Sequence, residues 1–368
     1  MAEYQALARK YRPQSFADVV GQGHVKTALC NTIDARRLHH AYLLTGTRGI
    51  GKTTIARIIA KCLECEDGIT SSPNPQNESW QEITQGTYPD VIEIDAASQT
   101  KVEDTRQLLE NTMYPPVKGR YKIYIIDEVH MLSASSFNAL LKTLEEPPSY
   151  VKFILATTDP HKIPPTVLSR CLQFQLQVLS REEIREQILK IAKAEGIACE
   201  SEAADLLARA ARGSMRDALS LCDQAVAQGG GSINASQVTA MLGTAGDKLI
   251  TQILDLLSPR SELEFPEVLS RIRAVSPNYR NLLDELVTVF HDLALYQLSG
   301  NPTLEIFSLS APVLKDYAAR FSPQDLQRCY QIVLEAISES AFCPDEASAF
   351  DMCLLRLCAF APQKKKPG

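Results

Sequence analysis

The chain has 368 residues, of which 45% are hydrophobic and 22% charged, and its formal net charge is −6. Its length exceeds what one ordinary hydrophobic core supports, so we expect two or three domains. The acidic balance excludes a general, strongly basic nucleic-acid binder, so any DNA contact must be a local patch or be shared with partners. No apolar run approaches the roughly 18 residues of a membrane span, and the N-terminus lacks a signal-peptide core, so no membrane partner is expected. The ten cysteines lie mostly in apolar helical patterns, which predicts free thiols and a reducing, cytoplasmic compartment.

Residues 1–23 carry basic and aromatic side chains ahead of a predicted helix at residues 24–36. One interpretation of this segment is an N-terminal arm that is docked on the rest of the chain. The helix has Val25, Leu29 and Ile33 on one face, which is the spacing of a buried helical face.

Residues 46–53 fit the phosphate-binding pattern G-x-x-x-x-G-K-[ST], between a predicted strand at residues 41–45 and a predicted helix. In that context backbone N–H groups wrap a polyphosphate, and the helix N-terminus adds to the attraction. Lys52 is expected to reach the β- and γ-phosphates, and the Thr53 hydroxyl to bind Mg²⁺. The alternative is a glycine-rich turn without a ligand, which the flanking strand and helix disfavour. The residues expected to bind the nucleotide here are Gly46, Thr47, Arg48, Gly49, Ile50, Gly51, Lys52, Thr53 and Thr54.

The next segments continue the alternation of helices and strands. Residues 66–77 are polar and contain two prolines, which predicts a loop. Residues 91–95 predict the second strand, and Thr100 with Glu103 fits a capping box that opens a helix to about residue 113.

Residues 121–126 predict a third, continuous apolar strand that ends in Asp127 and Glu128. This strand brings Asp127 to the C-terminal edge of the sheet, where open α/β sheets place ligands. Asp127 is expected to hold Mg²⁺ through water, and Glu128 to orient and deprotonate the attacking water. An acidic pair after a strand is by itself common turn chemistry. Downstream of a phosphate-binding loop, however, it indicates the second half of a nucleotide site.

The remaining pattern separates an α/β region from helical regions. Residues 133–146 predict an amphipathic helix ended by two prolines, and two further strands are predicted at residues 151–157 and 172–176. Strands that alternate with helices predict a mostly parallel sheet with helices on both faces. Past residue 179 only helical patterns remain.

These stretches together resemble an AAA+ ATPase of the clamp-loader group, which serves bacterial DNA polymerase III. The resemblance covers roughly residues 4–225. It implies an α/β AAA+ P-loop domain at residues 1–179, a helical lid at residues 180–243 and an all-α collar for oligomerisation at residues 244–362, followed by the start of a linker at residues 363–368. The supporting sequences are ALARKYRPQSFADVVGQ, HHAYLLTGTRGIGKTTIAR, IDAASQTKVEDTR, IIDEVHMLSASSFNALLKTLEEPP, ATTDPHKIPPTVLSRCLQF and GSMRDALSLCDQA.

The resemblance also implies roles for single residues. Thr158 takes the position of the first sensor, which hydrogen-bonds the γ-phosphate or the attacking water, and Thr157 is the neighbouring candidate. Arg216 would be the second sensor, which acts on the nucleotide of its own chain, and Arg170 the arginine finger offered to the ATP of a neighbouring subunit. For each arginine, a surface salt bridge is the simpler interpretation of its position alone. The adenine pocket would be lined by Arg12, Pro13, Val19 and Val20.

The chain departs from the family in one respect. The family carries a four-cysteine zinc module after the phosphate-loop helix, at about residues 62–85 here. Only Cys65 stands at a ligand position, because Asn74, Asn77 and Trp80 occupy the other three. Cys62 lies close in sequence, but two thiolates without a nearby histidine do not make a tetrahedral zinc site. No zinc is therefore expected, and Trp80 is a candidate to pack where the metal would organise the loop.

The implied function is that of an ATP-driven motor subunit in a hetero-oligomeric ring of clamp-loader subunits, with ATP and Mg²⁺ as cofactors. Such a ring opens a sliding clamp and closes it on primed DNA for DNA polymerase III, and this chain would contain no polymerase active site. Two alternatives are a branch-migration AAA+ motor and a non-hydrolysing scaffold. Lys52, Asp127 and Glu128 argue against the scaffold. The Ser-Arg-Cys motif at residues 169–171 and a helical C-terminal region without a winged-helix pattern argue against the branch-migration motor.

Overall fold

The computed structural model describes residues 5–98, 111–242, 245–258, 263–275, 278–300, 309 and 311–360. The chain forms two compact units, residues 1–238 and residues 239–368. The helix predicted from Thr100 lies outside the described residues, as does the predicted linker. No helix in the described ranges is long and apolar enough to cross a membrane.

A five-stranded parallel sheet forms the centre of the first unit, with the strand order β2-β3-β4-β1-β5. Its strands are β1 (Ala41–Thr45), β2 (Val91–Asp95), β3 (Lys122–Asp127), β4 (Val151–Thr157) and β5 (Leu172–Gln175). Every residue of β1 and β4 is buried, as expected for apolar strands covered on both faces. The register places Thr45 opposite Thr157 and Asp95 opposite Asp127. The carboxyl ends of these four strands therefore share one edge of the sheet.

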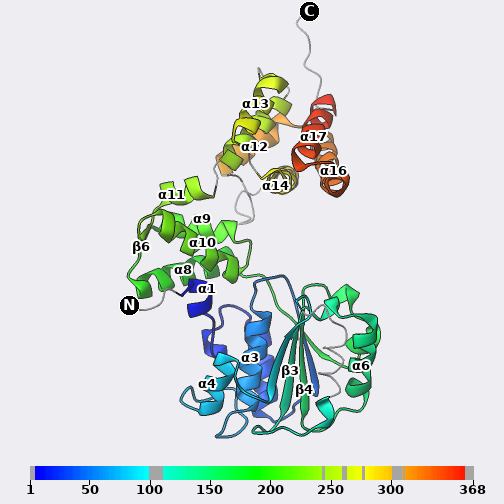
Figure 1. The fold of residues 1–368 in the computed structure, drawn as a ribbon. Helices are drawn as coiled ribbons and strands as arrows, with labels where there is room; N and C mark the ends of the chain where they lie inside the picture. Colours follow the sequence, from blue (N-terminus) through cyan, green and yellow to red (C-terminus); the bar gives the residue numbers. More distant parts are fainter. Residues whose placement is uncertain are drawn as a thin grey trace, which may run out of the picture. The chain divides into compact units, whose positions relative to one another are not determined.

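Helices cover both faces of this sheet, which confirms the predicted architecture. Tyr42 and Leu44 of β1 pack in one core with α2 (Gly23–Asp34) and α3 (Lys52–Leu63). The alternate residues Ala41 and Leu43 pack in a second core with α6 (Ala134–Glu145) and α7 (Pro165–Leu168). In Figure 1, α3 and α6 lie on opposite sides of β3 and β4. The further helices of this region are α4 (Glu78–Gln85), α6 (Ala134–Glu145), α7 (Pro165–Leu168) and the 3-10 turns η1 (Phe16–Asp18), η2 (Asn111–Met113), η3 (Val129–Met131) and η4 (Pro160–Lys162).

The lid region of the first unit begins where the sequence predicts a helix start. Ser180 and Glu183 form a reciprocal capping box, and Gly196 ends the helix in a left-handed conformation. The expectation that only helices follow residue 179 is wrong at one place, because a parallel pair of two-residue strands joins β6 (Ala198–Cys199) to β7 (Ser232–Ile233). Strands this short leave no alternating pattern to detect. The helices of the lid are α8 (Arg181–Glu195), α9 (Ser201–Ala210), α10 (Met215–Gln228) and α11 (Ala235–Met241).

The N-terminal segment is docked as an arm. Its short helix α1 (Leu7–Lys10) lies against the lid, where the Leu7 N–H donates to Asp223 Oδ2 of α10 at 2.9 Å. Beyond α1, the Lys26 ammonium of α2 donates to the Val19 carbonyl at 2.8 Å. The arm therefore contacts both the lid and the sheet domain.

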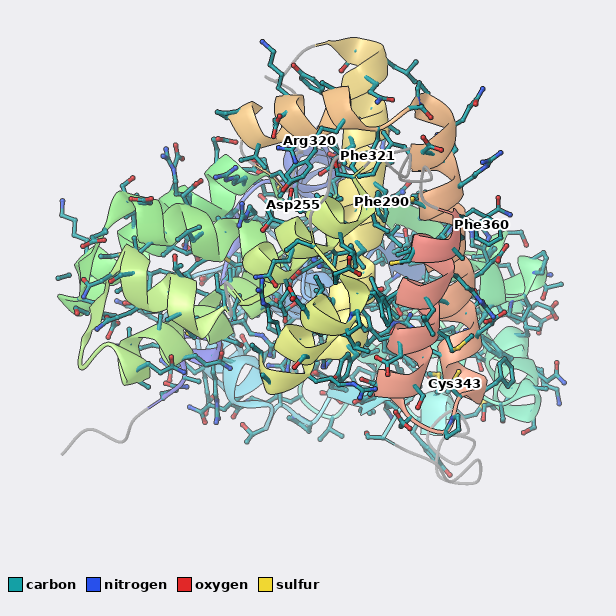
Figure 2. The ribbon with its side chains drawn as sticks, turned by 90° about the horizontal axis from the view of Figure 1, so that it is seen from above. Asp255, Phe290, Arg320, Phe321, Cys343 and Phe360 are labelled. Carbon is teal, nitrogen blue, oxygen red and sulfur yellow. The ribbon has the colours of Figure 1, made fainter. Side chains whose placement is uncertain are left out.

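Among the described residues of the second unit, every secondary-structure element is a helix. Its core surrounds α14, whose Phe290 is fully buried. Tyr317 and Arg320 of α15 (Ala311–Arg320) both donate to Asp255 Oδ1 of α12 (Ala245–Leu257), at 2.9 and 3.0 Å, which ties these helices together. Asp255 and Arg320 are labelled in Figure 2. The helices are α12 (Ala245–Leu257), α13 (Phe265–Val275), α14 (Tyr279–Ser299), α15 (Ala311–Arg320), α16 (Pro323–Glu339), η5 (Ser340–Phe342) and α17 (Glu346–Phe360).

Candidate nucleotide-binding site

The glycine loop between β1 and α3 has the backbone that its sequence predicts. Gly49 and Gly51 have φ angles of 80° and 103°, which glycine adopts without the steric cost of a Cβ. A Cβ at Gly51 would meet no atom within 4 Å, so the space beside this backbone is open. A Cβ at Gly49 would instead collide with the Ser214 hydroxyl at the start of α10. The loop is thus open on one side and packed against the lid on another.

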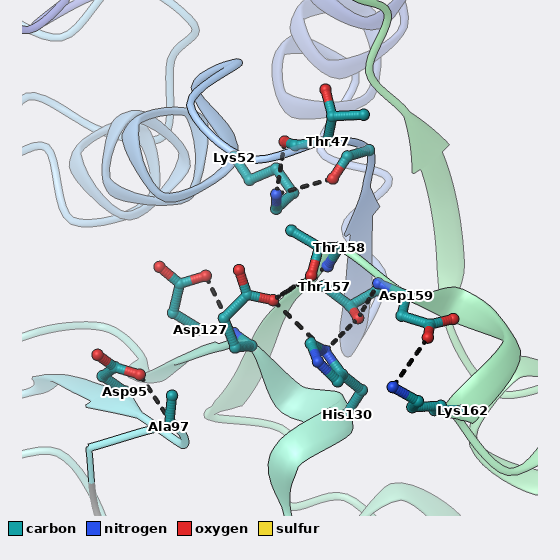
Figure 3. Close-up of polar contacts among 12 residues, drawn as sticks. Thr47, Lys52, Asp95, Ala97, Asp127, His130, Thr157, Thr158, Asp159 and Lys162 are labelled. Carbon is teal, nitrogen blue, oxygen red and sulfur yellow. Dashed lines mark hydrogen bonds and ion pairs between the residues drawn. The ribbon is translucent and has the colours of Figure 1, made fainter. Parts of the chain in front are cut away.

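Lys52 is the buried cation of this loop. Its side chain is only 5% exposed, and its ammonium donates to the carbonyls of Gly46 and Thr47 at 2.8 and 2.9 Å (Figure 3). Burial lowers the pKa of Lys52, while the nearby carboxylates of Glu128 and Asp127 act in the opposite direction. A lysine whose ammonium is held by the loop's own carbonyls can exchange those partners for phosphate oxygens, which form stronger charge-assisted bonds.

Thr53 and Asp127, predicted as the Mg²⁺ pair, are brought together. The Thr53 hydroxyl donates to Asp127 Oδ2 at 2.6 Å, and Asp127 Oδ1 accepts the Glu128 N–H at 3.0 Å. A hydroxyl and a carboxylate at the phosphate end of a loop are the oxygen donors that Mg²⁺ uses together with substrate phosphates. The donor set therefore fits a Mg²⁺–polyphosphate ligand.

Glu128 contacts the residue expected to be the first sensor. It has a left-handed backbone, with a φ of 48°. Its Oε2 accepts hydrogen bonds from the Thr158 N–H at 3.1 Å and the Thr158 hydroxyl at 2.9 Å. Thr157 points elsewhere, because its Oγ1 lies 2.9 Å from His130 Nδ1 and accepts the Asp159 N–H (Figure 3). Of the two threonines, Thr158 is therefore the one that holds the predicted base.

His130 is a site residue that the sequence prediction missed. Its Nδ1 lies 3.4 Å from Glu128 Oε2 as well as close to Thr157, and its side chain is 10% exposed. The available signal was a single polar residue in an apolar run directly after the acidic pair. His130 thus lies against both the predicted base and the end of β4.

The two arginines of the lid and the arm lie in one electrostatic neighbourhood. The backbone N–H of Arg216 donates to the Gly49 carbonyl at 3.4 Å, which places the start of α10 against the phosphate loop. Burial lowers the pKa of Arg12, and the positive charges of Arg57 and Arg216 act in the same direction, whereas the Asp127 carboxylate raises it. Val19 is buried, whereas Pro13 and Val20 are half-buried. The roles of these residues toward adenine stay predictions.

Arg170 is bound on the other face of the sheet. Its guanidinium donates to Glu145 Oε1 of α6 at 2.9 Å and to the Thr166 carbonyl of α7 at 2.7 Å, and the side chain is 34% exposed. Both partners belong to the layer opposite α3. Within one chain the arginine therefore forms a surface salt bridge, and its predicted role in a neighbouring subunit stays a prediction.

The segment at the place of the family's zinc module, about residues 62–85, is held by other interactions. The Asn77 amide donates to Cys65 Sγ at 3.5 Å and to Asp67 Oδ2 at 3.1 Å. The Trp80 ring lies 4.1 Å from the Lys61 ammonium. Within the described ranges, no group of three or more His, Cys, Asp or Glu side chains is placed to hold a metal. The donors present at the family's ligand positions therefore do not fit a tetrahedral zinc ion.

Comparison with protein families gives three matches along the chain. Residues 21–180 match the family described as "DNA polymerase III, delta subunit". Residues 183–231 match "DNA polymerase III clamp loader subunit, ATPase lid domain". Residues 233–367 match "DNA polymerase III subunits gamma and tau domain III".

Individual relatives extend these matches over nearly the whole chain. The DNA polymerase III subunit gamma of Buchnera aphidicola subsp. Acyrthosiphon pisum is 43% identical, over 96% of this chain and 98% of its own length. The DNA polymerase III subunit tau of Escherichia coli K12 is 50% identical over 99% of this chain, but the chain spans only 57% of that protein's length. Among solved structures, a Holliday junction branch migration motor of Thermotoga maritima aligns with 66% of this chain and 79% of its own, with a TM-score of 0.48 and 22% identity.

The burial of Lys61 gives a pH-dependent prediction. Burial lowers the pKa of Lys61 to about 8, and the Arg57 charge acts in the same direction, against Cys62 and Asp18. An exposed lysine has a pKa of about 10.4. Between about pH 8 and pH 10 the unfolded chain therefore binds more protons at this lysine than the folded chain does. In that range Lys61 makes the free energy of unfolding rise with pH. We expect wild type to gain stability relative to Lys61→Met across that range in urea denaturation. A difference between the two proteins that stays constant with pH would contradict the prediction.

Proposed function

Because the chain belongs to the family of DNA polymerase III gamma and tau subunits, we propose that it is an ATPase motor subunit of a clamp loader. The observation that carries the ATPase assignment is the junction of the phosphate loop with the acidic pair, made by the 2.6 Å bond from Thr53 to Asp127. It puts a buried lysine, two Mg²⁺-type oxygen donors and a carboxylate base at one edge of a parallel sheet. The site is that of an enzyme that hydrolyses the β–γ phosphoanhydride bond of ATP.

In the proposed reaction the chain positions the phosphates and removes a proton. Lys52 and the loop N–H groups bind the β- and γ-phosphates. Mg²⁺ held by Thr53 and Asp127 would neutralise phosphate charge. Glu128 accepts a proton from the attacking water, and Thr158, which holds one oxygen of that carboxylate, sets its direction. Arg216, in the first turn of α10, lies against the phosphate loop and responds to the nucleotide of its own chain.

The proposed partners follow from the family. We propose that residues 244–362 hold the chain in a hetero-oligomeric ring with other clamp-loader subunits, and that Arg170 reaches the ATP of a neighbour. The ring acts on a sliding clamp and on primed DNA in the cytoplasm, for DNA polymerase III. We further propose that the chain holds no zinc. Metal analysis of protein purified without chelators tests this, and about one zinc per chain would overturn it.

Two other functions are less well supported. A non-hydrolysing scaffold does not need the joined arrangement of Lys52, Thr53, Asp127 and Glu128. A branch-migration motor does not account for the match of residues 233–367 to a gamma and tau domain, nor for 43% identity over 98% of a gamma subunit. A clamp-loading ATPase accounts for the joined site residues and for the matches to gamma and tau subunits.

Removing the Lys52 charge tests the nucleotide site. We expect Lys52→Ala to weaken ATP binding by about tenfold or more, because a charge-assisted hydrogen bond contributes roughly 1.5–3 kcal/mol. We expect Glu128→Gln to retain ATP binding and lose turnover, since it removes the base and little else. Calorimetry with Mg²⁺ and ATP measures the first effect, and phosphate release in the assembled complex the second. Lys142→Ala, at an exposed lysine of α6, is the matched control, and equal ATP affinity of wild type and Lys52→Ala would contradict the proposal.

Arg170 gives a prediction for the assembled ring. We expect Arg170→Ala to leave ATP binding to the isolated chain unchanged and to reduce DNA-stimulated hydrolysis sharply, because arginine fingers contribute roughly 10³–10⁵ in rate in other systems. Glu145→Ala is the matched control, since it removes the same salt bridge and leaves the guanidinium in place.

The order of subunits separates action in a neighbour from action in the same chain. In tethered pairs of an Arg170→Ala chain and a Lys52→Ala chain, one order should retain turnover that the reverse order loses. If Glu145→Ala reproduced the loss, or if the order made no difference, Arg170 would be a structural residue only.

A further inference from the structure

The last turn of α3 carries a second buried lysine, Lys61. Its side chain is 3% exposed. The ammonium lies 4.1 Å from the centre of the Trp80 ring, a cation–π distance, and it donates a hydrogen bond to Gln14 Oε1. Lys61 therefore joins α3 to two distant segments, α4 and the N-terminal arm.

The contacts of Gln14 fix the orientation of its side-chain amide. A lysine ammonium can only donate, so the amide oxygen must face Lys61. The Thr84 hydroxyl of α4 donates to the Trp80 carbonyl at 2.7 Å and lies 3.4 Å from the same Gln14 oxygen. The amide nitrogen then faces the Arg12 carbonyl and donates to it at 3.0 Å. One amide thus connects the end of α3 to the backbone of Arg12.

The arm is also held on the lid side of Arg12. The Lys10 ammonium lies 2.6 Å from Glu195 Oε1 of α8, and the Tyr11 hydroxyl donates to the same carboxylate. Arg12 therefore lies between two fixed points, the lid contact at Glu195 and the Gln14 amide. The same helix that carries Lys61 begins with Lys52 and Thr53, nine residues or about 14 Å earlier along a rigid axis.

We propose that Lys61 and Gln14 are positioning residues for the base of the nucleotide. Lys61, covered by Trp80, holds Gln14, and Gln14 holds the backbone of Arg12 at the distance from the phosphate loop that α3 sets. This inference rests on the proposed ATP site and on the adenine pocket that the family resemblance implies, which Arg12 and Pro13 would line. It also gives a role to the segment at the place of the family's zinc module, since Trp80 occupies one of the family's ligand positions and lies against the ammonium.

Gln14→Glu separates positioning from general stabilisation. A carboxylate at residue 14 still accepts the Lys61 hydrogen bond, but it cannot donate to the Arg12 carbonyl and repels it. We expect the Kd of the full chain for Mg²⁺-ATP to rise about three- to tenfold, since one net hydrogen bond contributes roughly 0.5–1.5 kcal/mol. The Kd for inorganic tripolyphosphate, which has no base, should stay within about twofold of the wild-type value. The midpoint of thermal unfolding should stay within about 3 °C of wild type.

Two further variants complete the test. Lys61→Met removes the ammonium that binds the Gln14 oxygen, so we expect it to weaken ATP binding and to leave tripolyphosphate binding unchanged. This variant keeps the test available if Gln14→Glu does not fold. Lys118→Met is the matched control, because Lys118 pairs with Glu78 and Glu82 of α4. It should change neither Kd, because these ion pairs are largely exposed and exposed ion pairs contribute little to stability.

The outcomes distinguish this inference from the proposed function. If wild type binds ATP more tightly than tripolyphosphate and the position-14 and position-61 variants keep that preference, the positioning role is wrong while the ATP site stands. Equal losses for ATP and tripolyphosphate would also overturn it, because they would indicate a general structural effect. If wild type binds no ATP, the proposed function fails and the inference fails with it.

Discussion

The hydrogen bond from Thr53 to Asp127 fixes the first turn of α3 to the carboxyl end of β3, and the rest of the site depends on it. Ten of the twelve residues of α3 are buried, so this helix has little freedom to shift. The position of the helix sets where the side chains of its two buried lysines lie. Lys52 meets the carbonyls of the glycine loop at one end, and Lys61 meets Trp80 and Gln14 at the other. A single rigid helix thereby relates the phosphate side of the site to the arm.

Contacts from three parts of the first unit converge on this helix. The lid reaches the loop through Gly49, which has no room for a side chain beside Ser214. The acidic pair is oriented by β3 and by Thr158 at the end of β4. The arm crosses from the lid to the end of α3. The phosphate loop and α3 therefore contact the lid, the sheet edge and the arm through different segments of the chain.

The sequence predicted those parts of the fold whose signals are local. The strands at residues 91–95 and 151–157 were predicted with their observed bounds, since both are short stretches rich in apolar and β-branched residues. The third strand begins one residue later than predicted, because the Tyr121 N–H is bound by the buried Glu64 carboxylate. The loop, Asp127 and Glu128 were predicted from motifs, and Thr158 from the resemblance to a family. The contact of Lys61 with Gln14 spans 47 residues, and neither it nor the place of His130 leaves a periodic pattern in the sequence.

We propose that the loop from Gly46 to Thr53 and the carboxylate of Asp127 form one Mg²⁺-ATP site. A crystal structure of the chain with Mg²⁺ and a non-hydrolysable ATP analogue tests this. We expect the Lys52 ammonium to contact the β- and γ-phosphates instead of the Gly46 and Thr47 carbonyls, with Thr53 and Asp127 beside the metal and Arg12 beside the base. An analogue bound elsewhere, or a Lys52 that keeps its carbonyl partners with the analogue in place, would contradict it.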